Sequence, residues 1–146
     1  MNDGASAILI ASDKAVAKFG LKPRAKIIAS TTVGIEPRIM GFTPAPAIQK
    51  LLAMTHLSLD DIDVIELNES LASQALACTR ELGLADDGSR INPNGSAIAI
   101  GHPLGASGAR LVTTALNQLE NINGKYALCS MCIGVGQGIA LIIKRV

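Results

Sequence analysis

The stretch that decides the fold class is "YALCSMCIGVGQGIALIIKRV", residues 126–146. Its two aliphatic runs, "YALCSMCIG" and "GIALIIKRV", are typical of buried strands, and only a short glycine-rich turn separates them. A link of this length leaves no room for a crossover helix, so the two strands must pair antiparallel. Because the rest of the chain alternates strands with helices, we predict an α/β fold in which a mixed sheet carries helices on both faces.

Three further strands are predicted upstream, which makes the expected sheet five-stranded, with the element order βαβαβαββ. The expected strands are residues 4–12, 25–34 and 63–67, and the expected helices are residues 13–19, 44–55, 70–82 and about 105–120. Ser12 is the predicted N-cap of the first helix and Gly20 its stop, and Ser58 with Asp61 resembles a capping box. We therefore expect residues 1–146 to form one domain.

The composition fits one soluble domain and excludes several classes of protein. Hydrophobic residues make up 49% and charged residues 17% of the 146 positions, which is typical of a packed core rather than of disorder. A net charge of +1 and an aromatic content of 2% argue against a nucleic-acid partner. No apolar run is long enough to span a membrane, and three cysteines without a basic leader favour a cytoplasmic location.

The helix predicted in "GASGARLVTTALNQL", residues 105–119, is apolar around most of its circumference. Only Arg110, Asn117 and Gln118 are expected to contact water. One sheet can cover only one face of such a helix. The sequence therefore predicts a further layer, supplied by a second copy in a homo-oligomer or by another chain.

Three side chains with useful chemistry are predicted at strand ends, where open α/β sheets place their ligands. Asn68 follows the strand 63–67, His102 stands in "GHP" before the long helix, and Cys132 ends the first strand of the hairpin. Each residue also has an alternative interpretation, which is a structural role for Asn68 and His102 and a redox or metal site for Cys132. Asn68 is a common type of N-cap residue, and His102 fits a partly buried loop histidine without chemistry.

Cys129 and Cys132 form a C-x-x-C pair, a spacing that also occurs in redox and zinc sites. Residues three apart on a strand point to opposite faces, so we expect these two thiols to diverge. We favour Cys132 as a lone reactive thiol, beside the backbone N–H groups of Gly134 and its neighbouring glycines, and Cys129 as a core residue. The glycine runs match neither a P-loop nor a dinucleotide fingerprint.

A thiol, an imidazole and a carboxamide together suit acyl chemistry on a thioester. An imidazole can take the proton of a thiol nucleophile, and a carboxamide can hold a water. Backbone N–H groups can then receive the oxyanion that develops on the attacked carbonyl. This combination is more specific than any one of its members.

At these positions the sequence resembles the C-terminal half of the thiolase family, and the likeness covers essentially the whole chain. "ALCSMCIGVGQGIA", residues 127–140, fits the family's C-terminal signature. "NPNGSAIAIGHPLGASGAR", residues 92–110, fits the preceding signature except at Ser96, where a glycine is usual. "NES", residues 68–70, stands where the family reads Asn-Glu-Ala.

The resemblance implies a role for each candidate residue. His102 would activate the cysteine that carries the acyl group and would help to line an oxyanion hole. Asn68 would hold the water that completes this hole. Cys132 would be the second, acid/base cysteine, and the backbone N–H of Gly134 would contribute to the other oxyanion hole.

The implied reaction is reversible Claisen chemistry, in which CoA cleaves a 3-oxoacyl-CoA such as 3-oxoadipyl-CoA into acetyl-CoA and a shortened acyl-CoA. CoA is then a substrate rather than a bound cofactor, and the chemistry needs no metal. Ser70 and Leu71, which replace the usual Ala-Phe, would lie where the pantetheine arm of CoA passes. The acyl-carrying cysteine belongs to an N-terminal half that this sequence does not contain, so we expect the chain alone to be inactive.

Two other functions stay open at this point. The chain fits a non-catalytic fragment that self-associates through its uncovered helix. It also fits a weak thioesterase that uses Cys132 and His102 alone. Among partners, an N-terminal thiolase half or a second copy is expected, and neither nucleic acid nor a membrane is.

Overall fold

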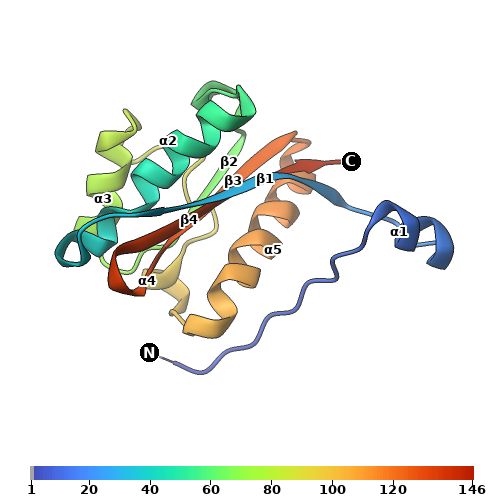
Figure 1. Ribbon diagram of the computed structural model, residues 1–146, viewed down its shortest axis with the longest axis horizontal. Coiled ribbons are helices and arrows are strands. Elements are labelled where there is room, and N and C mark those ends of the chain that lie inside the picture. The colour runs from blue at the N-terminus through green and yellow to red at the C-terminus, as the bar shows by residue number, and fades with distance from the viewer. Residues whose placement is uncertain (1) are drawn as a thin grey trace.

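The computed structural model describes residues 2–146, and within them a four-stranded mixed sheet forms the centre of the molecule (Figure 1). Its spatial order is β1 (Ala25–Gly34), β4 (Gln137–Arg145), β3 (Tyr126–Ile133) and β2 (Val64–Leu67). β3 and β4 pair antiparallel, as the short glycine-rich turn predicts, whereas β2 runs parallel to β3. The mixed α/β class is therefore confirmed.

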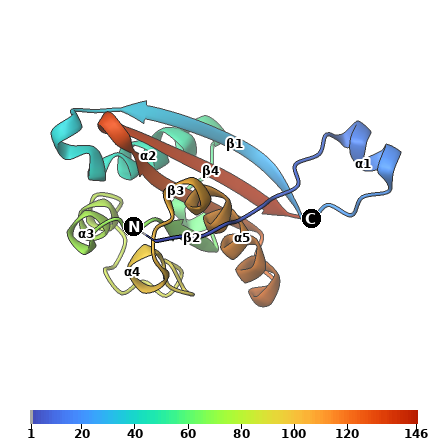
Figure 2. The same ribbon diagram turned by 90° about the horizontal axis from the view of Figure 1, so that it is seen from below.

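The expected fifth strand, residues 4–12, is wrong. This segment is extended but belongs to no strand, and it passes beside the long helix rather than along a sheet edge (Figures 1 and 2). A strand needs a neighbour that pairs with its backbone groups. Leu9 and Ile10 are 80% and 73% exposed, so the aliphatic side chains of this segment lie on a surface that no other part of this chain covers.

The first helix follows this segment and has the predicted ends. α1 (Asp13–Phe19) is capped by the Ser12 hydroxyl, which accepts the Ala15 N–H at 3.3 Å, and Gly20 ends it with a φ of 60°. None of its residues is buried, and it stands away from the sheet at one end of the molecule (Figure 2).

One face of the sheet is covered by α2 (Pro44–Thr55) and α3 (Ala72–Glu81). Three 3-10 turns complete the connections, η1 (Pro37–Phe42), η2 (Leu59–Asp61) and η3 (Gly134–Gly136). The predicted capping box is present, because the Asp61 carboxylate accepts the Ser58 N–H at 2.8 Å and the Ser58 side chain accepts the Asp61 N–H. The core of this face combines helix and strand residues, among them Ile48, Leu51, Leu67, Cys78, Leu128 and Ile142.

The other face carries α5 (Leu104–Ile122), preceded by the single turn α4 (Ala97–Ile100). Leu111, Ala115 and Leu119 recur every four residues, so they lie on one side of α5 and pack against β2, β3 and β4. The prediction that Arg110 contacts water freely is wrong. Its side chain is only 17% exposed, because it reaches back over β2 toward a buried carboxylate.

α5 lies over β2 and β3, as Figure 2 shows, and it leaves the same face of β1 open. Ile27 and Ile28 of β1 are therefore 47% and 37% exposed.

Among residues 2–146, no helix combines the length and the hydropathy that a membrane crossing requires.

Candidate active site

Asn68 and Cys132 lie close together because Ser70 contacts both. Asn68 directly follows β2, and its N–H donates to the Ser130 carbonyl at 3.0 Å, which extends the β2–β3 pairing by one step. The Asn68 Nδ2 donates to Ser70 Oγ at 3.2 Å, and Ser70 Oγ lies 3.3 Å from Cys132 Sγ. The N-cap of α3 is Leu71, so Asn68 does not cap that helix.

The end of β2 is held in place by the polar loop that precedes α4. The Asn92 side chain accepts the Leu67 N–H and donates to the Leu67 carbonyl, each at 2.8 Å, as a neighbouring strand would. Ser96, where the thiolase motif has glycine, is fully buried and donates to the same carbonyl at 3.1 Å. These bonds fix the backbone from which Asn68 projects.

His102 lies between α4 and α5, so its predicted place at a strand end is wrong. Its Nδ1 lies 2.6 Å from Ser107 Oγ, one turn into α5, and Ser107 Oγ donates to the Pro103 carbonyl at 3.2 Å. In the tautomer that places the ring proton on Nδ1, Ser107 accepts this proton and Nε2 keeps its lone pair. Burial, followed by the positive charge of Arg110, lowers the pKa of His102 below its usual 6.5. The ring is therefore a neutral base at pH 7.

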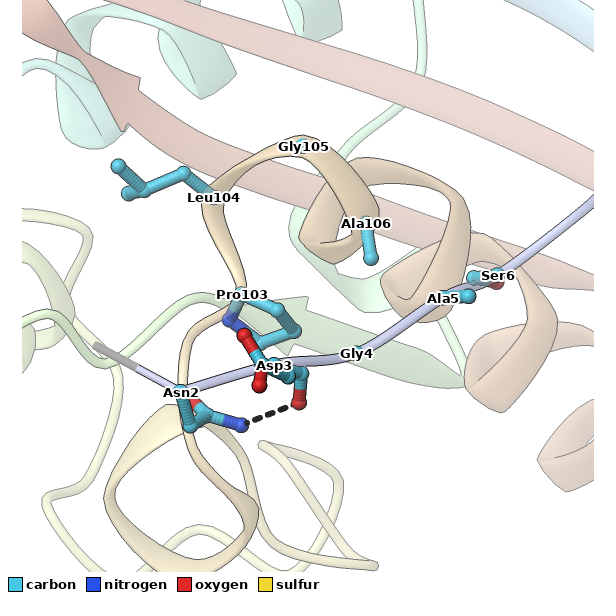
Figure 3. A pocket seen from close by; sticks show the side chains of 9 residues that line it. All are labelled: Asn2, Asp3, Gly4, Ala5, Ser6, Pro103, Leu104, Gly105 and Ala106. Atoms are coloured by element: carbon cyan, nitrogen blue, oxygen red, sulfur yellow. Dashed lines mark hydrogen bonds between the residues drawn. The ribbon is translucent and has the colours of Figure 1, made fainter.

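The N-terminal segment, residues 2–6, runs beside residues 103–106, which directly follow His102 (Figure 3). The Asn2 Oδ1 accepts the backbone N–H of His102 at 2.8 Å. A side chain at Gly4 would place its Cβ 2.6 Å from the Pro103 ring, so only glycine allows this close approach. Residues 2–6 and 103–106 line a shallow hollow here, and Asn68, His102 and Cys132 are not among its lining residues.

Arg110 links the His102 region to Asn68. It stands on α5 one turn after Ser107, and its Nη2 donates to Asn68 Oδ1 at 3.4 Å. Its Nη1 lies 3.5 Å from the Glu66 carboxylate. Within residues 2–146, no hydrogen bond joins His102 to Asn68 or to Cys132, so their meeting across a shared cleft stays a prediction.

Glu66 is the least expected group near the site, since it is a carboxylate that is 0% exposed within β2. Neither of its oxygens has a hydrogen-bond partner among the described residues. Burial raises its pKa to about 7, against the opposing effect of Arg110, and the charge of Glu69 adds to the rise. Between pH 4.5 and about 7, native Glu66 therefore holds a proton that the unfolded chain has already lost.

We expect the substitution Glu66→Gln to remove a pH dependence of stability. Between pH 4.5 and about 7 the native state binds more protons than the unfolded state, so the free energy of unfolding falls as the pH rises. Urea unfolding at pH 5 and pH 8 should show this fall to be larger by about 3 kcal/mol in the parent than in the glutamine variant. Parallel curves for the two proteins would contradict the assignment.

The two cysteines of the C-x-x-C pair diverge, as predicted. Cys129 packs in the core between the sheet and α5, whereas Cys132 faces the other side and contacts Ser70. Burial raises the pKa of Cys129, which makes it an inert core thiol. The three cysteines form no disulfide, and no cluster of three potential metal ligands occurs within residues 2–146.

The turn after Cys132 presents an open backbone. Gly134 is exposed, and a Cβ built on it would meet nothing within 4 Å. Gly136 has a φ of 82°, and a Cβ there would collide with the Ile35 carbonyl, so this position requires glycine for packing.

The predicted CoA-binding residue Leu71 lies directly before α3, and 65% of it is exposed.

Comparisons with known proteins show the family to which the chain belongs. Residues 21–145 match the family model for the C-terminal domain of thiolases. The chain belongs to the thiolase family. It is 80% identical, over its full length, to the beta-ketoadipyl-CoA thiolase of Acinetobacter baylyi, and 59% identical to the 3-oxoadipyl-CoA/3-oxo-5,6-dehydrosuberyl-CoA thiolase of Escherichia coli. In each case it spans only 36% of the relative's length.

Solved thiolase structures have the same fold. The crystal structure of human mitochondrial 3-ketoacyl-CoA thiolase superposes with a TM-score of 0.89 at 47% identity, covering 93% of this chain and 34% of that one. The Bacillus anthracis acetyl-CoA acetyltransferase gives a TM-score of 0.87 at 38% identity, covering 92% and 34%. The four-stranded unit with helices on both faces is therefore a thiolase fold.

The sequence analysis missed four residues that shape this candidate site. Ser107 looks like one more small residue of "GASGAR", and Arg110 resembles an ordinary surface charge. Asn92 lies in a polar loop whose composition does not single it out. Glu66 does give a signal in the sequence, because a charge in the middle of a short apolar strand requires a partner when it is buried.

Proposed function

We propose that this chain forms the C-terminal part of a thiolase active site that cleaves 3-oxoacyl-CoA with CoA, or runs the reverse condensation. The contact of Asn68 and Cys132 through Ser70 carries this proposal, since it sets a thiol beside a carboxamide at the ends of adjacent strands. A neutral imidazole with a free Nε2 stands at the start of α5. These are the groups that acyl transfer through a cysteine needs.

In this mechanism the acyl-carrying cysteine comes from the N-terminal part, which the relatives have and this chain does not span. His102 takes the proton of that thiol, whose sulfur attacks the 3-oxo carbon, and the bond between C2 and C3 then breaks. Cys132 gives its proton to the departing C2, which leaves as acetyl-CoA. The Cys132 thiolate next takes the proton of an incoming CoA thiol, whose sulfur attacks the acyl carbon and breaks its bond to the acyl-carrying cysteine, so that the shortened acyl-CoA leaves. His102 then returns its proton to the released cysteine thiolate. Each side chain ends as it began.

The oxyanions of this sequence are stabilised by N–H groups and by a water. The backbone N–H of Gly134, in an exposed turn two residues after Cys132, supports one oxyanion. A water held by Asn68, together with His102, supports the other. Leu71 offers an exposed apolar side chain on which the pantetheine arm of CoA can pack, and Ser70 lies beside it.

We further propose 3-oxoadipyl-CoA as the acyl substrate, within a cytoplasmic enzyme that works as an oligomer. The identities of 80% and 59% to relatives named for this substrate support the choice. The exposed aliphatic residues favour an additional protein layer, either the N-terminal part of a thiolase or a second copy. Among them are Leu9, Ile10, Ile27, Ile98 and Leu104.

The test is a chimera in which this chain replaces the aligned C-terminal part of the Acinetobacter baylyi thiolase, which is 80% identical to it. We expect the chimera to cleave 3-oxoadipyl-CoA in the presence of CoA, measured by the loss of the absorbance of the Mg²⁺-enolate. The 146-residue chain alone should show no turnover, because it lacks the acyl carrier. A folded chimera without activity would refute the proposed function, and turnover by the chain alone would refute the division of the site.

The non-catalytic alternative makes a different prediction for the same chain. Each exposed leucine or isoleucine that becomes covered contributes about 1.5–3 kcal/mol, so the open faces favour self-association. Light scattering at micromolar concentration separates the cases. Dimers of the chain together with an inactive chimera would favour the alternative, whereas an active chimera excludes a purely structural role.

A further inference from the structure

We propose that Ser70 is a positioning residue for Cys132, to which it donates the last hydrogen bond of a chain that starts at Arg110. This inference deepens the proposed function, which gives Ser70 only a place beside CoA. It rests on three contacts, Arg110 Nη2 to Asn68 Oδ1 at 3.4 Å, Asn68 Nδ2 to Ser70 Oγ at 3.2 Å, and Ser70 Oγ to Cys132 Sγ at 3.3 Å.

The direction of each bond follows from what each group can do. A guanidinium only donates, so the Asn68 atom that faces Arg110 must be the carbonyl oxygen. The amide nitrogen of Asn68 therefore faces Ser70, and it too can only donate. Ser70 Oγ accepts that proton, which leaves its own hydroxyl proton to point at the sulfur of Cys132. An amide has two N–H groups, so Asn68 keeps a second one for the water of the oxyanion hole.

The serine itself is held from a second side. Its backbone N–H donates to Gln74 Oε1 at 3.1 Å, and Gln74 is 7% exposed on the first turn of α3. A Cβ at Gly41 would lie 2.8 Å from the Gln74 side chain, so glycine at that position makes room for it. Gln74 therefore fixes the backbone of Ser70, and the Asn68 amide holds its Oγ beside the sulfur.

A hydrogen bond to a charged acceptor is stronger than one to a neutral acceptor, so this donor favours the thiolate of Cys132 over its thiol. In the mechanism above, Cys132 must hold a negative charge after it has protonated C2. The Ser70 hydroxyl stabilises the sulfur at that moment. It is also in place to accept from the thiol before the step.

The test measures the thiolate of Cys132 directly in the 146-residue chain, without any turnover. Iodoacetamide reacts with thiolates, and mass spectrometry of the peptides separates Cys132 from the other two cysteines. We expect Ser70→Ala to slow alkylation of Cys132 about tenfold at pH 8 and to move the rate profile to higher pH. Ser73→Ala, at an exposed position of α3, is the matched control and should react like the parent.

Two variants of nearly equal side-chain shape separate the loss of the hydroxyl from a disturbance of packing or folding. Ser70→Thr keeps the hydroxyl and Ser70→Val replaces it with a methyl group. The threonine variant should stay within about twofold of the parent, and the valine variant should lose reactivity as alanine does. Equal profiles for threonine and valine, or an alanine profile that matches the parent, would overturn the proposal.

The ionisable groups near this chain of bonds are the same in all these proteins, so their charges cancel in the comparison. They are Cys78, which interacts with Cys132, and Glu66, Glu69, Arg110 and His102. The alkylation experiment also tests the role of Ser70 independently of the proposed thiolase activity. An inactive chimera with a normal serine effect would refute thiolase activity alone, and an active chimera without a serine effect would refute only the role of Ser70.

Discussion

Replacing Cys132 with alanine is expected to lower thiolysis of 3-oxoadipyl-CoA by the chimera by about 10²- to 10⁴-fold, the usual contribution of a positioned acid/base group. The thiol is one of the few groups that can protonate the departing carbon, and it then activates the incoming CoA. The loss should fall on kcat, because Cys132 is 8% exposed and offers little surface for substrate binding.

Cys129→Ala is the control for this variant. It removes the same atoms from a buried position of the same strand, but on the face that packs against α5. It should lower stability by about 1 kcal/mol and leave kcat within a few-fold of the parent. If both cysteine variants lose activity equally, the loss reflects packing of β3 rather than chemistry at Cys132.

The hairpin of residues 126–146 could be predicted from the sequence because its short turn leaves a single way to pair its strands. The helix ends at Ser12 and Gly20 were predicted for the same kind of reason, since caps are local chemistry. Residues 4–12 have an equally good strand pattern and are no strand. Whether an aliphatic run pairs depends on a neighbouring strand, which is a property of distant parts of the fold.

In the candidate site too, local sequence features could be predicted and long-range contacts could not. Asn68 and Cys132 could be found because they end strands that the sequence shows. Their contact through Ser70 could not be found, since it depends on the register of β2 against β3 and on the turn before α3. The buried pair of Glu66 and Arg110 was missed because a helix pattern does not show which way a long side chain bends.

His102 provides the second large expected effect. The His102→Ala variant of the chimera should lose about 10²- to 10⁴-fold in kcat/KM, because no other group described at the start of α5 can take the proton of the acyl-carrying thiol. In the parent, kcat/KM should also fall below pH 6.5 as the ring takes up a proton. The fall should lie at a lower pH than for a free histidine, since burial and Arg110 lower the pKa of His102.

His56 is the matched control, because it is the other histidine of the chain. It is exposed at the end of α2 with a φ of 54°, a conformation that asparagine tolerates well. His56→Asn should therefore keep full activity and the same pH profile. A profile in which the acid limb survives in His102→Ala, or disappears in His56→Asn, would show that the imidazole of His102 is not the base, whatever the size of the loss in rate.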